Sequence, residues 1–525
     1  MNNIKIITFN QKTLGKSTLE LYIYLSEDIF MENQKTQAAP FKMRYGLIFL
    51  IGFAFFGISL LWQVYDSWCP TFLTELFMKA MNTTDSQEVQ YLVGVIMALD
   101  NLAALILLPI FGHLSDKTHT KLGKRMPYIL VGTFVCAIAF PFIPVFFHYN
   151  NMAGMIALML IVVVFAMMYR NPAVSLMPDL TPKPLRSRAN GIINIMGYIG
   201  GFFATLVGMI FVLSSYLGRK GQDNWAYNNI WAIEIPFLVA SVLMLISAVV
   251  LVCTIHENKL EEEMKEEMKR GEEQAEIVDK IKDDDAPLTK TNRIMLFLIL
   301  GAEFFWFMAD NGIGTYMTNY TLYHLYAPTS ATSLNVIIGG VGSMIGFVLG
   351  GLIASKIGRK YTVISGLSLT ALSFLTWIIL SFTYIPGVIE SNLAILENNA
   401  TLPDTVAKAS TVFPWPIYAV WFIKGLGMSL VHINSFPMVV ELCSSKKIGA
   451  YTGYYYASSM AAQTITPMLI GFLLMNPKIF NYTYLPVYAG VCIAISLIVF
   501  FFLPNVKTRK TKISKGLEAI GQDDE

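Results

Sequence analysis

Charged residues are scarce in this chain. Only 14% of its 525 residues are Asp, Glu, Lys or Arg, while 54% are hydrophobic. A soluble globular protein carries about 25% charged residues because its surface faces water, so the composition excludes that class and indicates an integral membrane protein. The formal net charge of +2 gives no indication of a nucleic-acid partner, and we expect none.

Cysteine and the common catalytic motifs are also rare or missing. The five cysteines show no CxxC or other metal-type spacing. We therefore interpret them as small apolar residues and not as a redox or metal site. The sequence contains no HExxH, GxSxG or Walker motif, which argues against a membrane-embedded enzyme. We therefore expect no catalytic residue, no metal and no cofactor.

Long apolar runs are abundant. Runs of about 20 residues, enough to cross a hydrocarbon core of about 30 Å, occur twelve times. Strict period-2 alternation is missing, so the runs are predicted to be helices and not barrel strands. The predicted fold is an all-α membrane protein with twelve transmembrane helices. The runs begin near Tyr45, Val89, Pro127, Met152, Asn190, Ile230, Ile294, Leu334, Tyr361, Trp415, Gly449 and Tyr484.

A highly charged segment divides the apolar runs into two groups of six. It extends from His256 to Arg293 and cannot enter lipid, so it is predicted to be a solvated, partly helical linker. The predicted organisation is an N-terminal tail (1–43), a first six-helix bundle (44–255), a charged cytoplasmic linker (256–292), a second bundle (293–505) and a cytoplasmic tail (506–525).

Basic residues distinguish the two ends of the predicted bundles. Lys and Arg are more numerous in the loops after the second, fourth, eighth and tenth runs than in the opposite loops. Such residues concentrate on the cytoplasmic side of a membrane, so we expect a multi-pass protein of the cell membrane with both termini in the cytoplasm. The N-terminal stretch has no signal-peptide pattern. We expect translation to start at Met31, and a start at Met1 with an ordinary disordered extension is the alternative.

Two motifs occur once in each half. "GHLSDKTHTKLGKR" follows the second run and the shorter "GGLIASKIGRK" follows the eighth. "YRNPAVSLMPDL" matches "VHINSFPMVVEL" at one common offset, which places Arg170 against His432 and Asp179 against Glu441. Two homologous six-helix halves are the construction of carriers that work by alternating access. We expect such a carrier, acting as a monomer.

The basic loop resembles the signature loop of the major facilitator superfamily. Its form here, together with "NPAVSLMPDLTPKPLRSRANGIINIMGYIGG", resembles the glycoside-pentoside-hexuronide:cation symporters, in the branch of plant sucrose transporters and their animal and bacterial relatives. The resemblance implies that this loop latches the halves on the cytoplasmic side. A carboxylate at Asp116 can pair with Lys124 or Arg125. The predicted gating residues are Asp116, Lys124, Arg125, Asp179, Arg359 and Glu441. Topology alone is the alternative role of this loop.

Ionisable residues lie inside the predicted helices. Each costs about 2.5 to 3.5 kcal/mol near the bilayer centre, so it normally faces a cavity or a partner. All but one lie on the first, fourth, seventh or tenth helix, which line the central cavity in the superfamily that this chain resembles. The set comprises Asp66, Asp100, Arg170, Glu303, Asp310, Lys424 and His432.

Asp66 and Asp100 are the predicted cation-coupling residues. They are expected at similar depth, and two nearby carboxylates cannot both ionise cheaply without a counter-charge. Separate ion pairs, for example with Lys424, are the alternative. The cation sites of the resembled families do not transfer, because Val163 replaces the acid of plant sucrose transporters and Leu108 precedes Pro109 where sodium-coupled relatives carry an acid pair.

A sugar site needs planar polar groups and an aromatic face. The fragments "LLWQVYDSW" and "AEFFWFMADNGIGTYMTNY" supply both, although aromatic residues at helix ends are also common interfacial anchors. The predicted substrate-binding residues are Trp62, Gln63, Tyr65, Arg170, Trp306, Asp310, Asn311, Tyr316, Lys424 and His432. The expected function is proton-coupled uptake of a disaccharide of the maltose or sucrose type. A sodium-coupled carrier, an uncoupled carrier and a sugar sensor remain open.

Overall fold

The structure is a computed structural model that describes residues 41–213, 216, 230–282, 290–399, 410–442 and 448–504. Within these residues, twelve helices are long and apolar enough to cross a membrane, which confirms the predicted all-α fold. The predicted and observed starts agree closely. The largest differences are Ile294 against Lys290 and Leu334 against Ser330, four residues in each case.

The first half contains six spans. Its elements are α2 (Tyr45–Ala80), η1 (Ser86–Val89), α3 (Gln90–Lys117), α4 (Met126–Ala139), α5 (Phe142–His148), α6 (Met152–Asp179), η2 (Lys183–Leu185), α7 (Arg186–Ile210) and α9 (Trp231–Thr254). Helices α4 and α5 together make the third span. Stacked aromatic rings fill the core of this half, for example Phe72 and Phe147 with ring centroids 4.2 Å apart. This packing supplies the rigid body on which the functional side chains lie.

The second half also contains six spans. Its elements are α11 (Lys290–Asn319), the π-helical turn η4 (Tyr320–His324), α12 (Ser330–Ile357), α13 (Arg359–Thr383), α14 (Ile385–Asn398), α16 (Pro416–Glu441), α17 (Ile448–Leu474), η6 (Tyr482–Tyr484) and α18 (Leu485–Phe501). One continuous hydrophobic core extends from Met295 to Leu503 through this half.

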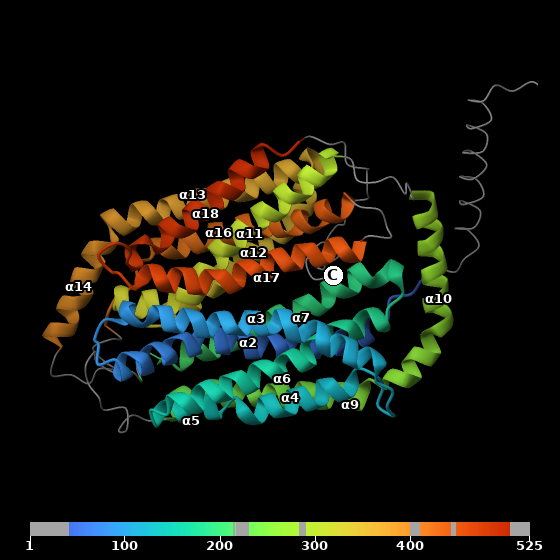
Figure 1. The fold of residues 1–525 in the computed structure, drawn as a ribbon, viewed down its shortest axis with the longest axis horizontal. Helices are drawn as coiled ribbons and strands as arrows, with labels where there is room; N and C mark the ends of the chain where they lie inside the picture. Colours follow the sequence, from blue (N-terminus) through green and yellow to red (C-terminus); the bar gives the residue numbers. More distant parts are fainter. Residues whose placement is uncertain are drawn as a thin grey trace, which may run out of the picture. The chain divides into compact units, whose positions relative to one another are not determined.

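Figure 1 shows the two halves as separate bundles, blue to green for the first and yellow to red for the second. Helix α10 (Glu257–Lys282) follows the first bundle, crosses its end and occupies the charged linker. Helix α14 crosses the opposite end of the second bundle. We call the end with α10 and the α3–α4 loop the linker side, and the end with η1 and α14 the distal side.

Local sequence explains several helix ends. Gly358 has φ of 86° and separates α12 from α13, a backbone conformation that glycine adopts without steric cost. The Asn151 side chain caps α6 by accepting a hydrogen bond from the backbone N–H of Gly154, as polar residues at this position commonly do. Hydropathy determines which segments span the membrane, and residues such as these determine where the helices begin and end.

Hydrogen bonds join the two halves on the distal side. The Asn101 side chain on α3 donates to the backbone oxygen of Gln463 on α17 at 3.2 Å. The Tyr323 hydroxyl in η4 donates to the Glu75 carboxylate on α2 at 2.6 Å. Each bond has one partner in the first half and one in the second, so the halves are in direct contact at this end of the molecule.

Candidate functional site

Carboxylates in the middle of the first two spans lie close together. The Tyr65 hydroxyl on α2 donates a hydrogen bond of 2.7 Å to Oδ2 of Asp100 on α3. Asp66 interacts electrostatically with Asp100 and with Arg170 on α6. Asp66 is exposed, and Asp100 and Arg170 are partly exposed. Two carboxylates and one guanidinium therefore interact within the membrane spans, and we call Tyr65, Asp66, Asp100 and Arg170 the first cluster.

A second group of charges lies on α11 and α16. Lys424 forms an ion pair with Asp310, and its ammonium also lies 4.7 Å from the ring centroid of Trp421, within the range of a cation–π contact. His432 interacts electrostatically with Asp310 and packs its ring against Phe307. We call Asp310, Lys424 and His432 the second cluster. Lys424 thus pairs within its own half and not with Asp66 or Asp100.

Two residues next to the clusters carry polar atoms without a hydrogen-bond partner. Among the described residues, Trp62 Nε1 and Asn311 Oδ1 are buried without a hydrogen-bond partner. The Trp62 ring lies edge-on to Tyr65, with ring centroids 5.6 Å apart, and Asn311 adjoins Asp310 in the chain. Buried polar atoms nearly always have a partner, so these two are available to a bound molecule or to water.

A small polar cavity lies between the halves. It has a volume of about 30 Å³ between α2 and α7 of the first half and α11 and α12 of the second, which is enough room for water. Most of its lining side chains are hydroxyls or amides. They include Gln63, Ser67, Thr205, Thr318, Thr332 and Ser333.

Two predicted aromatic residues lie elsewhere. Trp306 is fully buried and packs against Phe500 in the core of the second half. Tyr316 is fully buried, and its hydroxyl donates to the backbone oxygen of Pro467 at 2.6 Å. The structure therefore places both rings inside the packed second half. Glu303 is likewise fully buried, and neither of its carboxylate oxygens has a hydrogen-bond partner among the described residues.

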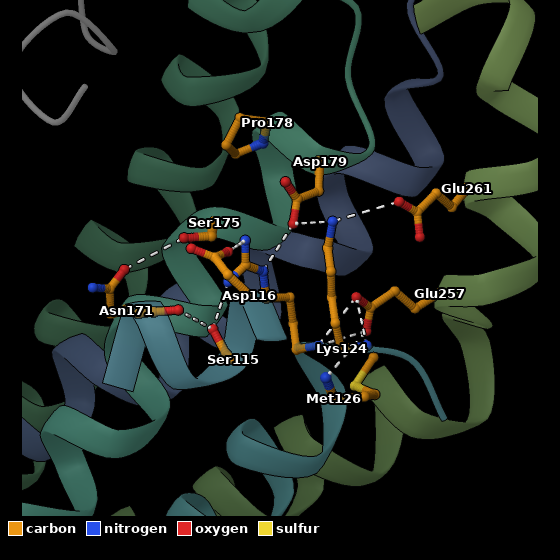
Figure 2. Close-up of polar contacts among 12 residues, drawn as sticks. Ser115, Asp116, Lys124, Met126, Asn171, Ser175, Pro178, Asp179, Glu257 and Glu261 are labelled. Atoms are coloured by element: carbon orange, nitrogen blue, oxygen red, sulfur yellow. Dashed lines mark hydrogen bonds and ion pairs between the residues drawn. The ribbon is translucent and has the colours of Figure 1, made fainter. Parts of the chain in front are cut away.

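A network of charges holds the α3–α4 loop on the linker side (Figure 2). Arg125 forms an ion pair with Asp116, donates from Nε to Asp179 Oδ2 at 2.8 Å, and donates to the Ser115 hydroxyl. The expected pairing of Asp116 with Arg125 is thereby confirmed. The Arg125 side chain is only 7% exposed, so one guanidinium ties the end of α3 to the end of α6.

Helix α10 joins the same network. Lys124 pairs with Asp179 at 3.3 Å and with Glu261 on α10 at 3.4 Å. Burial lowers the pKa of Lys124, but the Asp179 and Glu261 carboxylates raise it by more, so it lies above its ordinary value. Glu257 accepts hydrogen bonds from the backbone N–H groups of Lys124, Arg125 and Met126. Its carboxylate therefore caps α4, where the helix dipole favours an anion.

The sequence did not point to Glu257 or Glu261, because they lie in a run of acids with no distinguishing pattern. Arg359 is the first residue of α13. Glu441 is the last residue of α16, and its side chain lies outside the described residues, as do the N-terminal tail with Met31 and the segment 505–525.

Solved transporters share this fold. The inward-open xylose transporter XylE from E. coli has a TM-score of 0.57 at 16% identity, over 90% of this chain and 98% of that chain. A mutant of the nucleoside transporter NupG has a TM-score of 0.56 at 12% identity, over 87% and 99%. A bacterial homologue of the iron transporter ferroportin, in an inward-facing state, has a TM-score of 0.56 at 13% identity, over 88% and 99%.

No curated protein matches the chain. The profile of the Major Facilitator Superfamily, however, matches residues 47–396, which cover the first bundle, the linker and the first helices of the second bundle. The match agrees with the two six-span bundles and with the charged α3–α4 loop. The chain therefore belongs to the major facilitator superfamily and is a secondary transporter of the membrane, not an enzyme.

Proposed function

We propose that this transporter takes up a disaccharide or related glycoside of the maltose or sucrose type together with a proton, by alternating access. The observation that carries the proposal is the first cluster, in which Asp66 interacts with both Asp100 and Arg170. Two ionised acids beside one base leave a net negative site inside the membrane, and binding a cation or proton neutralises it. The second cluster already contains its own balanced ion pair.

Hydroxyl recognition supports a glycoside as the substrate. Trp62 Nε1 and Asn311 Oδ1 supply one unpaired donor and one unpaired acceptor, and the inter-half cavity adds the Gln63 amide and several hydroxyls. A sugar ring needs such groups around its hydroxyls and an aromatic face against its C–H side. The resemblance of the α3–α4 loop to glycoside:cation symporters agrees with this assignment. The proposed location is the cell membrane, with the linker side in the cytoplasm.

The test measures uptake of a panel of labelled glycosides into proteoliposomes with and without an imposed pH gradient. We expect a gradient to drive accumulation in the wild type. Asp66→Asn and Asp100→Asn should abolish accumulation but retain part of the exchange between external and internal sugar, because each amide removes the titrating group. Glu397→Gln, an exposed acid on α14, is the matched control and should behave as the wild type.

Each other outcome assigns a different function. Accumulation that needs a sodium gradient would identify sodium coupling, and exchange without accumulation under either gradient would identify an uncoupled carrier. Loss of exchange and accumulation together in both Asn variants would place Asp66 and Asp100 in the sugar site or the scaffold. Binding without any exchange would indicate a sensor.

A further inference from the structure

A buried polar network crosses between the halves on the distal side. Asn319, at the end of α11, inserts its amide between α2 and α3. Its Oδ1 accepts from the Thr71 hydroxyl at 2.9 Å, and its Nδ2 donates to the Thr74 hydroxyl at 3.0 Å and to Gln90 Oε1 at 3.3 Å. Gln90 Nε2 donates to the Thr74 hydroxyl at 3.2 Å. One side chain of the second half thus bonds to three of the first.

All four members of this network are fully shielded. Thr71, Thr74, Gln90 and Asn319 each have 0% exposure. A buried donor or acceptor that loses its partner keeps the full cost of its desolvation, so the amide of Asn319 is essential while the distal side is closed. When that side opens, water can reach all four groups and replace the lost bonds. The network therefore stabilises one arrangement of the halves and not the other.

We infer that Asn319 is the residue that locks the distal side during transport, through its bonds to Thr71, Thr74 and Gln90. This inference rests on the alternating access contained in the proposed function. Each transport cycle must break and remake this set of bonds. These hydrogen bonds therefore affect the ratio of two populations. One is the conformation open to the linker side, and the other is the conformation open to the distal side.

Asn392 provides a matched control. It is also a fully buried asparagine, on α14 at the distal side, and it makes three hydrogen bonds, to the backbone oxygens of Leu325 and Val412 and from the N–H of Val412, each 2.8 Å. All of these bonds lie within the second half. Asn319→Leu and Asn392→Leu therefore remove the same number of buried bonds, but only the first removes bonds between the halves.

The experiment measures distances between spin labels in the full-length protein, in a background without the native cysteines that retains transport. One label pair reports on the linker side, at the exposed residues His119 and Lys356. The other pair reports on the distal side, at the exposed residues Asn82 and Lys478. Asn319→Leu should raise the population with a long distal distance and a short linker-side distance by about tenfold, which corresponds to about 1.4 kcal/mol.

Asn392→Leu should lower the melting temperature to a similar extent but leave both distance distributions as in the wild type. Equal distributions for the two leucine variants would overturn the inference. Thr71→Val, which keeps the shape of the side chain and removes only its hydroxyl, tests the same lock if Asn319→Leu does not fold. It should shift the populations in the same direction, and an unchanged distribution would count against the lock.

The failure of this inference differs from the failure of the proposed function. A wild type whose distances never change, with or without transported sugar, would contradict alternating access itself. A wild type that changes between two distributions, with variants that do not alter their ratio, would contradict only the role of Asn319.

Discussion

At the residue scale, the charges of the second cluster depend on each other. The Lys424 side chain is 13% exposed and that of Asp310 is 41% exposed, and the two form their ion pair between α11 and α16. Removing one member of a partly desolvated pair leaves the other charge with less compensation, whereas removing both is often tolerated. The pair is therefore best studied through the difference between single and double variants.

Lys424→Met should destabilise the protein by about 1 kcal/mol, because the partly exposed Asp310 carboxylate loses its charged hydrogen-bond donor. The double variant Lys424→Met with Asp310→Asn should recover most of that loss, since no uncompensated charge remains. Thermal unfolding in detergent measures both effects. A double variant that is as unstable as the single one would show that Lys424 acts through packing on Trp421 instead.

Residue types alone predicted some members of the clusters but not which residues they contact. Tyr65 is predicted as an aromatic residue for sugar, and the structure places its hydroxyl on Asp100. Trp306 and Tyr316 carry the same residue-level signal as Trp62, yet they lie in the packed core and at a backbone carbonyl. Composition cannot distinguish them, because the face of a helix that meets the space between the halves depends on all its neighbours.

At the element scale, α10 is fastened to the first half. Besides the Glu257 cap, Asn258 donates to the backbone oxygens of Thr120 and Lys121, and Met264 is 3% exposed. The described part of the charged linker thus contains a docked helix that supports the α3–α4 loop. Its docking should respond to pH through Glu257.

Burial raises the pKa of Glu257, although three backbone N–H groups and Lys124 lower it in part. A raised pKa in the docked state means that docking is strongest below the ordinary value of 4.5 and weakens as pH rises through the raised value. Proteolytic cleavage of α10 should therefore become faster as the pH rises above 4.5. Glu257→Gln should remove this dependence.

Glu262→Gln is the control for this experiment, because Glu262 is an exposed acid on the same helix. It should retain the pH dependence of the wild type. The protease must be corrected for its own pH profile with an unfolded peptide of the same sequence. A persistent pH dependence in Glu257→Gln would assign the effect to another group.

At the scale of the whole molecule, the halves approach each other closely where α3 and α17 touch through glycine. A Cβ on Gly94 would overlap the backbone oxygen of Pro467, and a Cβ on Gly471 would lie 2.5 Å from that of Gln90. The backbones at Pro467 and Gln90 cannot move aside for a methyl group as a flexible side chain could. The closed distal side therefore requires glycine at both positions.

Gly94→Ala and Gly471→Ala should each disfavour the closed distal side by about 1 to 3 kcal/mol, the usual cost of overpacking. Transport should slow in both variants, and the distal spin-label distance should lengthen. Gly453→Ala on the same helix α17 meets nothing within 4 Å, so it should transport as the wild type. Wild-type distances in Gly94→Ala would show that α3 and α17 can separate slightly at no cost.

Hydropathy and charge in the sequence were sufficient to predict twelve spans and to locate the ionisable residues within them. Those features are local, because the cost of placing a residue in lipid depends mainly on that residue and its neighbours along the chain. Only the tertiary structure decided that Lys424 pairs with Asp310, that Glu257 caps α4 and that Asn319 bonds to Thr71. Such contacts join residues far apart in the chain, and several partners of suitable charge were available to each. Packing of the helices selects one of them.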